Sequence, residues 1–433
     1  MNQSKLGGQG SSSRSSGTVS LPNALYMSSR ETETSKSVAL ALPQCGIQNA
    51  TLNCNRRDLP DIRHMLYLSM TDSLSHPSRR TVLRTAAVLA AGVSLPKLRA
   101  QSDTIAAYRT PHKYPELVLT ATNTHGDFDE RSVDDPIVFR ANGEFNMLYI
   151  GFDGTGYQTG LATSPDLLKW TRKALVGPRD PTSKYTKYNL AISSILRDKN
   201  LHGTGEAIKV GSRYLGAWHA YPNAGYEEGA AVIGLAWSHD LLHWDLTEPI
   251  LFPHDGAAWE HGGLYRPDLL FNSGIYYLYY NAKTDPLPKS EGGGWHEQSG
   301  VATSRDLKIW TRYPQNPILP VGNKEANARD ARFASNPYVV KNGPEFAMYY
   351  FGFGYQRPGR ACEMVALGKD PFHFTKVPDI LIDTGPSGTI DETFAHKPSI
   401  IFHDGILYHF YCAVSGKWPN EIRGVAVARS KPW

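Results

Sequence analysis

Short apolar and β-branched runs separated by turns make up most of the chain from about residue 115 onwards. Residues 137–139 follow the polar opening Asp135-Pro136, a turn follows at Gly143, and residues 145–151 form a second apolar run. Runs of this length bounded by Gly, Pro and Asn are typical of β-hairpins. Similar pairs of runs follow four later polar openings, which are Glu206-Ala207, Arg266-Pro267, Asn336-Pro337 and Lys397-Pro398. The pattern predicts repeated hairpins that each open on a polar residue.

A second motif closes each of these units. The segment from Ser164 to Trp170, which contains Asp166 and Leu167, has close relatives that end at residues 244 and 310 and a weaker one that ends at 374. Successive ends at 170, 244, 310 and 374 are 74, 66 and 64 residues apart. A period of this length made of strands and turns predicts a β-propeller of four-stranded blades. We expect the Ser and Asp to hold a tight turn, so the motif is architectural.

Five openings and five closing motifs, the last running into Trp433, predict five blades. A short apolar strand follows most closing motifs, but nothing follows Trp433, and residues 115–119 have the same character. We expect this N-terminal segment to supply the missing strand, which would leave no open sheet edge. The predicted fold is therefore all-β: a five-bladed β-propeller with blades of four antiparallel strands, closed by an N-terminal strand.

The first hundred residues have a different character. Residues 1–64 are rich in Ser and aperiodic, which predicts either a disordered tail or an extension upstream of the true start codon. Residues 65–100 contain Arg79-Arg80, an apolar run at 86–95 and Ala100, which together resemble a twin-arginine-type signal peptide. About ten apolar residues cannot span a bilayer, which needs about 20. We predict cleavage near Ala100, leaving residues 101–433 as a single catalytic domain in the periplasm or outside the cell, with no membrane attachment.

Composition narrows the partners and cofactors. A net charge of +4 over 433 residues, with no long run of Lys or Arg, argues against nucleic acid. After cleavage Cys362 and Cys412 would remain, and they would form either a disulfide or two buried thiols. No Cys or His spacing resembles a zinc site, so we expect neither a metal nor another cofactor. The sequence does not predict the oligomeric state.

These features resemble the five-bladed propeller glycosidases of glycoside hydrolase family 43, to which families 32, 68, 117 and 130 are related in architecture. The resemblance covers roughly residues 115–433 and is carried by Asp135-Pro136, the Ser-x-Asp-Leu-x-x-Trp copies and the Tyr-rich second strands. It implies a glycosidase with a base at Asp135 and two further carboxyls on later blades. The chain departs from family 43 where Asn336 and Lys397 open the later units. It also departs from families 32 and 68, because Arg266-Pro267-Asp268 replaces their order of Arg, Asp and Pro.

Glycosidic cleavage needs a protonated acid and a second carboxylate on opposite sides of the anomeric carbon. The predicted catalytic residues are Asp135 as base or nucleophile, Glu206 as acid, and Asp268 as an aid to the acid or a sugar ligand. Glu260 is a rival for the acid. Asp268 could instead form a salt bridge with Arg266, which shares its strand face.

Basic, amide and aromatic side chains would complete the pocket. The predicted substrate-binding residues are Arg266, Glu260, Trp259, Asp330, Arg332, Asn336, His396, Lys397 and Trp295. Neutral sugars accept hydrogen bonds from such groups, and this much positive charge also suits an anionic substrate or phosphate.

The prediction is an exported glycoside hydrolase that cleaves a furanoside or short oligosaccharide by carboxylate acid/base catalysis. A glycoside phosphorylase and a non-catalytic carbohydrate-binding propeller are the alternatives. Asp135 is central to the hydrolase hypothesis.

Overall fold

The computed structural model describes residues 105–356, 360–417 and 420–433. The predicted extension, signal peptide and cleavage point at 1–100 lie outside these residues. Within them, the elements besides strands are 3₁₀ turns of three residues, at Ala106–Tyr108, Pro253–Asp255, Ala258–Glu260 and Lys289–Glu291. The all-β prediction is confirmed. No helix in this described part of the chain is long and apolar enough to cross a membrane.

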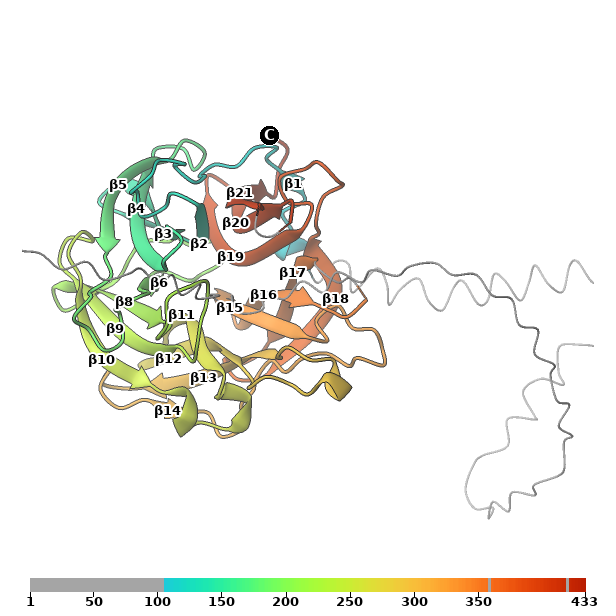
Figure 1. Ribbon diagram of the computed structural model, residues 1–433. Coiled ribbons are helices and arrows are strands. Elements are labelled where there is room, and N and C mark those ends of the chain that lie inside the picture. Colours follow the sequence, from blue (N-terminus) through green and yellow to red (C-terminus); the bar gives the residue numbers. More distant parts are fainter. Residues whose placement is uncertain (1–104, 357–359, 418–419) are drawn as a thin grey trace, which may run out of the picture. The chain divides into compact units, whose positions relative to one another are not determined.

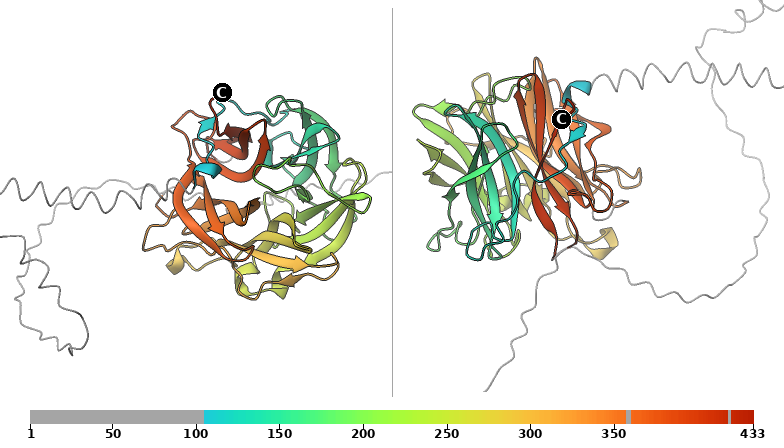
Figure 2. Two further views of the ribbon diagram at one scale, coloured as in Figure 1. Left: turned by 180° about the vertical axis from the view of Figure 1, so that it is seen from behind. Right: turned by 90° about the horizontal axis from the view of Figure 1, so that it is seen from above.

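Antiparallel pairing gathers the strands into consecutive groups (Figures 1 and 2). The first group comprises β2 (Ser132–Ala141), β3 (Glu144–Phe152), β4 (Tyr157–Ser164) and β5 (Thr171–Gly177). The second comprises β6 (Ala191–Ile195), β8 (Arg213–Ala220), β9 (Val232–Ser238) and β10 (Asp245–Leu251), with β7 (Lys209–Val210) paired to β8.

The remaining strands belong to one 12-stranded sheet made of three such groups. These are β11 (Gly263–Asn272), β12 (Ile275–Lys283), β13 (Glu297–Ser304) and β14 (Thr311–Arg312); then β15 (Phe333–Asn342), β16 (Glu345–Phe353), β17 (Ala361–Gly368) and β18 (Phe374–Ile382); then β19 (Phe394–His403), β20 (Ile406–Ser415), β21 (Ile422–Arg429) and β1 (His112–Lys113). Single parallel contacts, Glu297 with Phe333 and Ala361 with Phe394, join the three groups. Figure 1 shows all the groups around a common centre.

The first strand of four groups carries the same irregularity at its Xaa-Pro dipeptide. Asp135, Arg266, Asn336 and Lys397 have φ of 58°, 48°, 57° and 66°, and the strand register shifts at each of them. Residues with a side chain rarely adopt this left-handed conformation. A bulge of this kind changes the direction of the side chain next to it. The first strand of the second group lacks the dipeptide, because it is β6 and not the segment that begins at Glu206. The predicted opening at Glu206-Ala207 is therefore wrong.

Side chains on these first strands bind the backbone of the neighbouring group. Three such hydrogen bonds run from Leu269 N to Ser194 Oγ at 2.9 Å, from Val339 N to Asp268 Oδ2 at 2.8 Å, and from Val138 N to Ser399 Oγ at 2.9 Å. The third joins the last group to the first. The first strands therefore lie next to one another around the centre.

A buried acid precedes a tyrosine by 20 residues in four of the groups. The tyrosine hydroxyls donate to the acids at 2.8–3.1 Å, in the pairs Tyr149–Asp129, Tyr280–Glu260, Tyr350–Asp330 and Tyr411–Asp391. Each acid also pairs at 2.5–2.7 Å with a cation of the outermost strand, which is Arg172, Arg312, Lys376 or Lys113 respectively. Because Lys113 belongs to β1, an N-terminal strand supplies this cation in the last group. β1 also pairs with β21.

The Ser-x-Asp-Leu-x-x-Trp copies form the tight turns that the sequence predicts. In the first copy Ser164 Oγ accepts from Leu167 N at 2.9 Å, and Asp166 Oδ1 accepts from Lys169 N at 2.8 Å. Leu167 takes the left-handed conformation, with φ of 67°. Trp170 Nε1 donates to the carbonyl of Leu167 at 3.2 Å. The architectural interpretation of the motif is confirmed.

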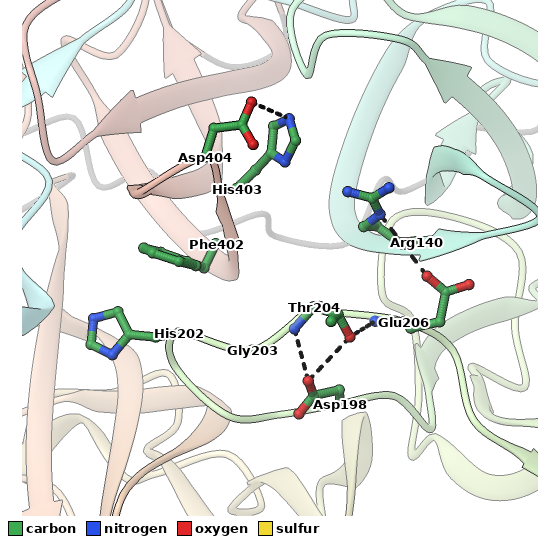
Figure 3. Close-up of a pocket in the computed structure, with 9 residues that line it drawn as sticks. All are labelled: Arg140, Asp198, His202, Gly203, Thr204, Glu206, Phe402, His403 and Asp404. Carbon is green, nitrogen blue, oxygen red and sulfur yellow. Dashed lines mark hydrogen bonds and ion pairs between the residues drawn. The ribbon is translucent and has the colours of Figure 1, made fainter.

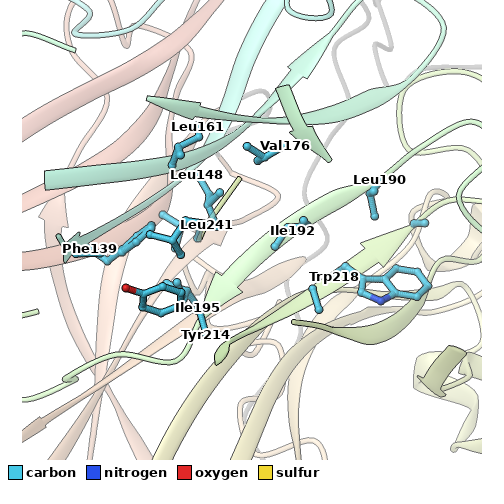
Figure 4. Packing of buried hydrophobic residues seen from close by; sticks show 14 of the residues in the cluster. Phe139, Leu148, Leu161, Val176, Leu190, Ile192, Ile195, Tyr214, Trp218 and Leu241 are labelled. Carbon is cyan, nitrogen blue, oxygen red and sulfur yellow. The ribbon is translucent and has the colours of Figure 1, made fainter. Parts of the chain in front are cut away.

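Apolar side chains fill the space between neighbouring groups. Figure 4 shows the cluster between the first two groups, which includes Phe139 and Leu148 from the first group and Ile192 and Trp218 from the second. All four side chains are at most 1% exposed. Burial on this scale stabilises the fold by about 1.5–3 kcal/mol for each large side chain.

Candidate active site

Asp135 forms a buried ion pair at the bulge of β2. Its Oδ1 lies 2.6 Å from Arg266 Nε, yet neither atom has a directed hydrogen bond. The other Arg266 nitrogens donate to the carbonyls of Ser193 at 2.9 Å and Pro398 at 3.2 Å. Burial raises the pKa of Asp135 to about 6, against the opposing charges of Arg266 and Lys397. A carboxyl with such a pKa can hold a proton near neutral pH and donate it.

Asp134, the preceding residue, points into a different set of contacts. Its Oδ2 accepts from Lys397 Nζ at 2.6 Å, Arg423 Nη1 at 2.9 Å and Tyr226 Oη at 3.1 Å. Burial opposes ionisation of Asp134, but Lys397 and Arg423 outweigh it and hold the pKa well below its usual range. Asp134 therefore positions Lys397. The negative charge of Asp134 is balanced by Lys397 and Arg423, so Asp134 is a structural residue.

One group of possible metal ligands lies in the described part of the chain, formed by Asp134, His396 and Cys412 within 4.8 Å of one another. Two cations already contact Asp134, so this group does not suit a metal ion. His396 places its Nδ1 3.0 Å from the carbonyl of Cys412. Cys362 and Cys412 are two buried thiols, which settles the alternative between a disulfide and two thiols.

Glu227 is a second carboxylate, from the loop between β8 and β9. Its side chain is 21% exposed, and its Oε2 lies 2.9 Å from Lys283 Nζ. Lys397 Nζ lies 3.9 Å from its other oxygen. Burial opposes its charge, but Lys283 and Lys397 lower the pKa of Glu227 to about 2. Glu227 is therefore ionised at any pH at which the protein would work.

Lys283 sits among three aromatic rings. The ring centroids of Tyr221, Tyr265 and Trp295 lie 5.1, 4.8 and 5.1 Å from its Nζ. Aromatic faces attract a cation at this range. The rings and Glu227 together fix the position of this lysine.

Glu297, the first residue of β13, is a third carboxylate and is 4% exposed. It accepts hydrogen bonds from Trp295 Nε1 at 2.8 Å, Ser335 Oγ at 2.7 Å and Asn281 Nδ2 at 3.3 Å. Lys283 is its partner on the neighbouring strand. Lys283 and Trp295 thus connect Glu227 with Glu297, and the charge of Lys397 acts on both Glu227 and Asp135. We call these three acids the carboxylate cluster: Asp135, Glu227 and Glu297.

Several buried polar atoms at this cluster lack a partner within the described residues. They include the hydroxyl of Tyr221 and Asn281 Oδ1. The hydroxyls of Tyr157 and Tyr265 lie close by, beside Tyr226 and Glu297 respectively. Tyr221 lies 6.4 Å from Tyr157 and 5.9 Å from Tyr265 between ring centroids. Unpaired buried polar groups are rare in proteins. Their concentration here indicates a site for a ligand rich in hydroxyl groups.

Five predicted substrate-binding residues lie at or beside the carboxylate cluster. Arg266, Lys397 and Trp295 contact its acids directly. Asn336 is 2% exposed, and its side-chain amide lies 2.8 Å from Oγ of Ser335, whose hydroxyl donates to Glu297. The carbonyl of Arg332 accepts from Glu297 N at 3.1 Å.

Three other predicted residues take part in packing instead. Glu260 and Asp330 belong to the acid–tyrosine–cation sets described above, and each carboxylate already has two partners. Trp259 stacks on Tyr280, with ring centroids 6.1 Å apart and an interplanar angle of 13°. None of the three contacts the carboxylate cluster in the interactions of the described residues.

Asp268 anchors the neighbouring strand. Its Oδ1 lies 2.5 Å from Lys199 Nζ, and its Oδ2 accepts from Val339 N at 2.8 Å. Arg266 pairs with Asp135, so the alternative salt bridge between Arg266 and Asp268 does not form. Both oxygens of Asp268 therefore already have structural partners.

Glu206 lies apart from Asp135, in a hollow of about 460 Å³ (Figure 3). Its carboxylate is 3.9 Å from Arg140, and the backbones of the two residues pair. Arg140 is five residues beyond Asp135 on β2, which corresponds to about 16 Å at roughly 3.3 Å per residue. The structure does not bring Glu206 to the carboxylate cluster, because the segment that carries it follows β6 and packs at the far end of β2.

The comparisons with known proteins agree with a site for glycans. No family model matches the chain. A solved structure described as a complex of BT0996 and RGII is 29% identical, with a TM-score of 0.66, covering 77% of this chain and 95% of that one. A second, described as a glycoside hydrolase, is 27% identical with a TM-score of 0.65, covering 77% and 96%. The resemblance to propeller-type glycosidases is confirmed.

Two further relatives are similar in fold or in part of the sequence. A glycosyl hydrolase from Bacteroides ovatus has a TM-score of 0.55 at 15% identity, covering 74% of this chain and 93% of that one, which shows a shared fold. A curated 1,2-β-oligomannan phosphorylase of Thermoanaerobacter sp. (strain X514) is 26% identical over 157 residues, 35% of this chain. The match spans 43% of that phosphorylase, less than half of its length. An enzyme that acts on glycans fits all of these relatives.

Proposed function

We propose that the chain is an exported glycoside hydrolase whose catalytic groups are the carboxylate cluster. The observation that carries this proposal is the contrast between the pKa values of two acids on which the charge of Lys397 acts. Asp135 has its pKa raised to about 6, whereas the pKa of Glu227 is lowered to about 2. Two carboxyls whose environments separate their pKa values in this way suit acid and base roles.

The scaffold in this proposal is a five-bladed propeller. Each antiparallel group would be one blade, and β1 would be the outer strand of the last. The hydrogen bond between Ser399 and Val138, which joins the last group to the first, supports closure of the ring. So does Lys113, which takes the place that outer-strand cations occupy in three other groups.

In the proposed mechanism Asp135 donates its proton to the leaving oxygen as the glycosidic bond breaks. Glu227 either takes a proton from the attacking water or bonds to the anomeric carbon itself. This reverses the role that the sequence predicts for Asp135, because burial makes it a better acid than base. Glu297, held by three donors, would accept hydrogen bonds from ring hydroxyls. The three tyrosine hydroxyls would complete the binding of the sugar.

The pairing of the three cations around Asp135 and Glu227 favours water over phosphate as the attacking group. Arg266, Lys397 and Lys283 each lie within 2.9 Å of a carboxylate oxygen. Cations already neutralised in this way are poor ligands for a phosphate dianion. A phosphorylase is the second candidate, supported by the curated relative.

Amide variants test the proposal. Wild type, D135N, E227Q and E297Q would be assayed on aryl glycosides, arabinofuranosides and fructans, with and without phosphate. We expect turnover without phosphate, a loss of at least about 100-fold in D135N and E227Q, and retained sugar binding. Turnover that requires phosphate would indicate the phosphorylase. Sugar binding without any turnover in the wild type would indicate a non-catalytic propeller.

Export is a separate part of the proposal and is supported by the sequence of residues 65–100. Mass spectrometry of the mature protein should find an N-terminus near Gln101. A mature protein that begins well before Gln101 would contradict it.

A further inference from the structure

Arg332 differs from the other basic side chains near the carboxylate cluster. Four of them have a carboxylate oxygen within 2.9 Å, namely Arg266, Lys397, Lys283 and Arg423. Within the described residues, Arg332 has no carboxylate at ion-pair distance, and its Nε and Nη2 are buried without an acceptor. A guanidinium that gives up water without gaining an acceptor costs free energy. A ligand that supplies the acceptor would recover it.

Arg332 is held against the cluster by its backbone. Its carbonyl accepts from Glu297 N at 3.1 Å, and its own N–H donates to the carbonyl of Phe353 at 3.0 Å. The guanidinium carbon lies 5.4 Å from the ring centroid of Phe333. That ring stacks on Trp295 at 6.1 Å and 17°, and Trp295 donates to Glu297. The stacked rings of Phe333 and Trp295 therefore connect Arg332 with Glu297.

Further basic groups lie on the same side of the site. Lys324 Nζ is 4.6 Å from the ring centroid of Tyr355, and His296 Nε2 is 3.1 Å from its hydroxyl. Burial lowers the pKa of Arg332, while Tyr355 and Glu297 oppose that effect. Burial, together with Arg332 and Lys324, lowers the pKa of His296. The positive charge on this side of the site therefore comes from Arg332 and Lys324, in contrast to the neutralised pairs around Asp135.

We propose that Arg332 binds the carboxylate of an acidic sugar, so that the substrate carries a hexuronate next to the bond that is cleaved. Nε and Nη2 form one edge of the guanidinium and match the two oxygens of a carboxylate. A neutral sugar would leave the buried Nε and Nη2 without a charged acceptor. This inference rests on the proposed glycosidase function and names its substrate class.

The test compares each acidic oligosaccharide with the same oligosaccharide after its carboxyl group has been reduced to an alcohol. Wild type, R332K and R332M would be assayed on both. We expect the wild type to prefer the acidic form by about 10- to 100-fold in kcat/KM. R332M should bring that ratio close to 1, and R332K should lie between, because a lysine keeps the charge but not the paired donors. Arg213, which lies over Trp237 at 4.7 Å outside the cluster, provides the control R213M, with an unchanged ratio.

Two results would overturn the inference. One is a wild type with no preference for the acidic form. The other is an R332M that lowers kcat/KM equally on both forms, as a purely structural residue would.

Binding to the full protein keeps the inference testable if the hydrolase proposal fails. Calorimetry should show that free galacturonate or glucuronate binds more tightly than galactose or glucose, and that R332M removes the difference. Inorganic phosphate or sulfate that binds as tightly as the uronates, and that R332M also removes, would make Arg332 an oxyanion site and contradict the proposal. Thermal melting of each variant confirms that it is folded.

Discussion

Asp135 and Arg266 lie 2.6 Å apart, and each has a left-handed backbone conformation immediately before a proline. Such a conformation costs roughly 1–3 kcal/mol for a residue with a side chain. The two strained positions come from β2 and β11, and the strain places the acid and the cation at the same point near the centre. Strained backbone of this kind is often found where a protein binds or reacts. The repeated Xaa-Pro bulge of the fold therefore places two residues of the proposed active site.

We expect D135N to lose activity while keeping the fold. Asn tolerates the left-handed conformation, so the backbone at Asp135 is not perturbed. Loss of the donated proton should lower kcat by about 100-fold or more. Steady-state kinetics and thermal melting would be measured together.

The neighbouring variant D134N is the control. Asp134 binds Lys397 and Arg423, and removing its charge should destabilise the protein by about 3–5 kcal/mol. A D135N that keeps more than a tenth of the activity would contradict the role of Asp135.

The raised pKa of Asp135 predicts an unusual dependence of stability on pH. The folded protein binds this proton more tightly than the unfolded chain, because the pKa rises from 3.8 to about 6 on folding. The contribution of Asp135 to stability is therefore complete below about pH 4 and falls as the pH rises through 6, by about 3 kcal/mol at most. Arg266, Lys397, Asp134 and Glu227 all act on this group.

Chemical denaturation between pH 4 and pH 7 would measure this effect. Because D135N lacks the titrating group, its stability should fall less over this range than that of the wild type. The kcat/KM of the wild type should also fall above about pH 6, as the acid loses its proton. Parallel stability curves for the two proteins would refute the assignment.

Replacing Lys283 should change the titration of Glu227. Without the cation 2.9 Å away, the pKa of Glu227 should rise from about 2. In K283M the acidic limb of kcat/KM should therefore move to higher pH, and Met should still fill the space among the three rings. Lys209 provides a matched control, since its Nζ lies 4.5 Å from the Tyr214 ring centroid outside the cluster. An acidic limb that shifts equally in K209M, or that does not shift in K283M, would show that Lys283 does not act through Glu227.

The period of the closing motif predicted the all-β class, and the Xaa-Pro openings predicted Asp135, Arg266 and Lys397 at the site. The second group lacks that dipeptide, so Glu206 was assigned to a strand that it does not begin. Glu227 was missed because it lies in a loop between strands, where the repeat gives no register.

The structural acids could have been recognised in the sequence by their spacing from a tyrosine. Asp129, Glu260, Asp330 and Asp391 each precede a tyrosine by 20 residues, which marks them as repeated structural residues. Glu297 stands at the start of β13, where the first copy of the repeat has Tyr157. An acid that breaks a repeat is thus a better candidate for chemistry than one that follows it.

The last prediction concerns the N-terminal strand. Lys113 lies 2.5 Å from Asp391, whose side chain is 2% exposed and also accepts from Tyr411. K113M would leave this buried carboxylate without its cation, at a cost of about 1–3 kcal/mol, and should lower Tm by a few degrees. Deleting residues 110–120 should lower it further, because the pairing with β21 is lost as well. Lys184, an exposed residue whose Nζ lies 4.9 Å from the ring centroid of Tyr185, provides the control K184M with unchanged melting. Unaltered melting of the deletion variant would mean that β1 does not close the ring.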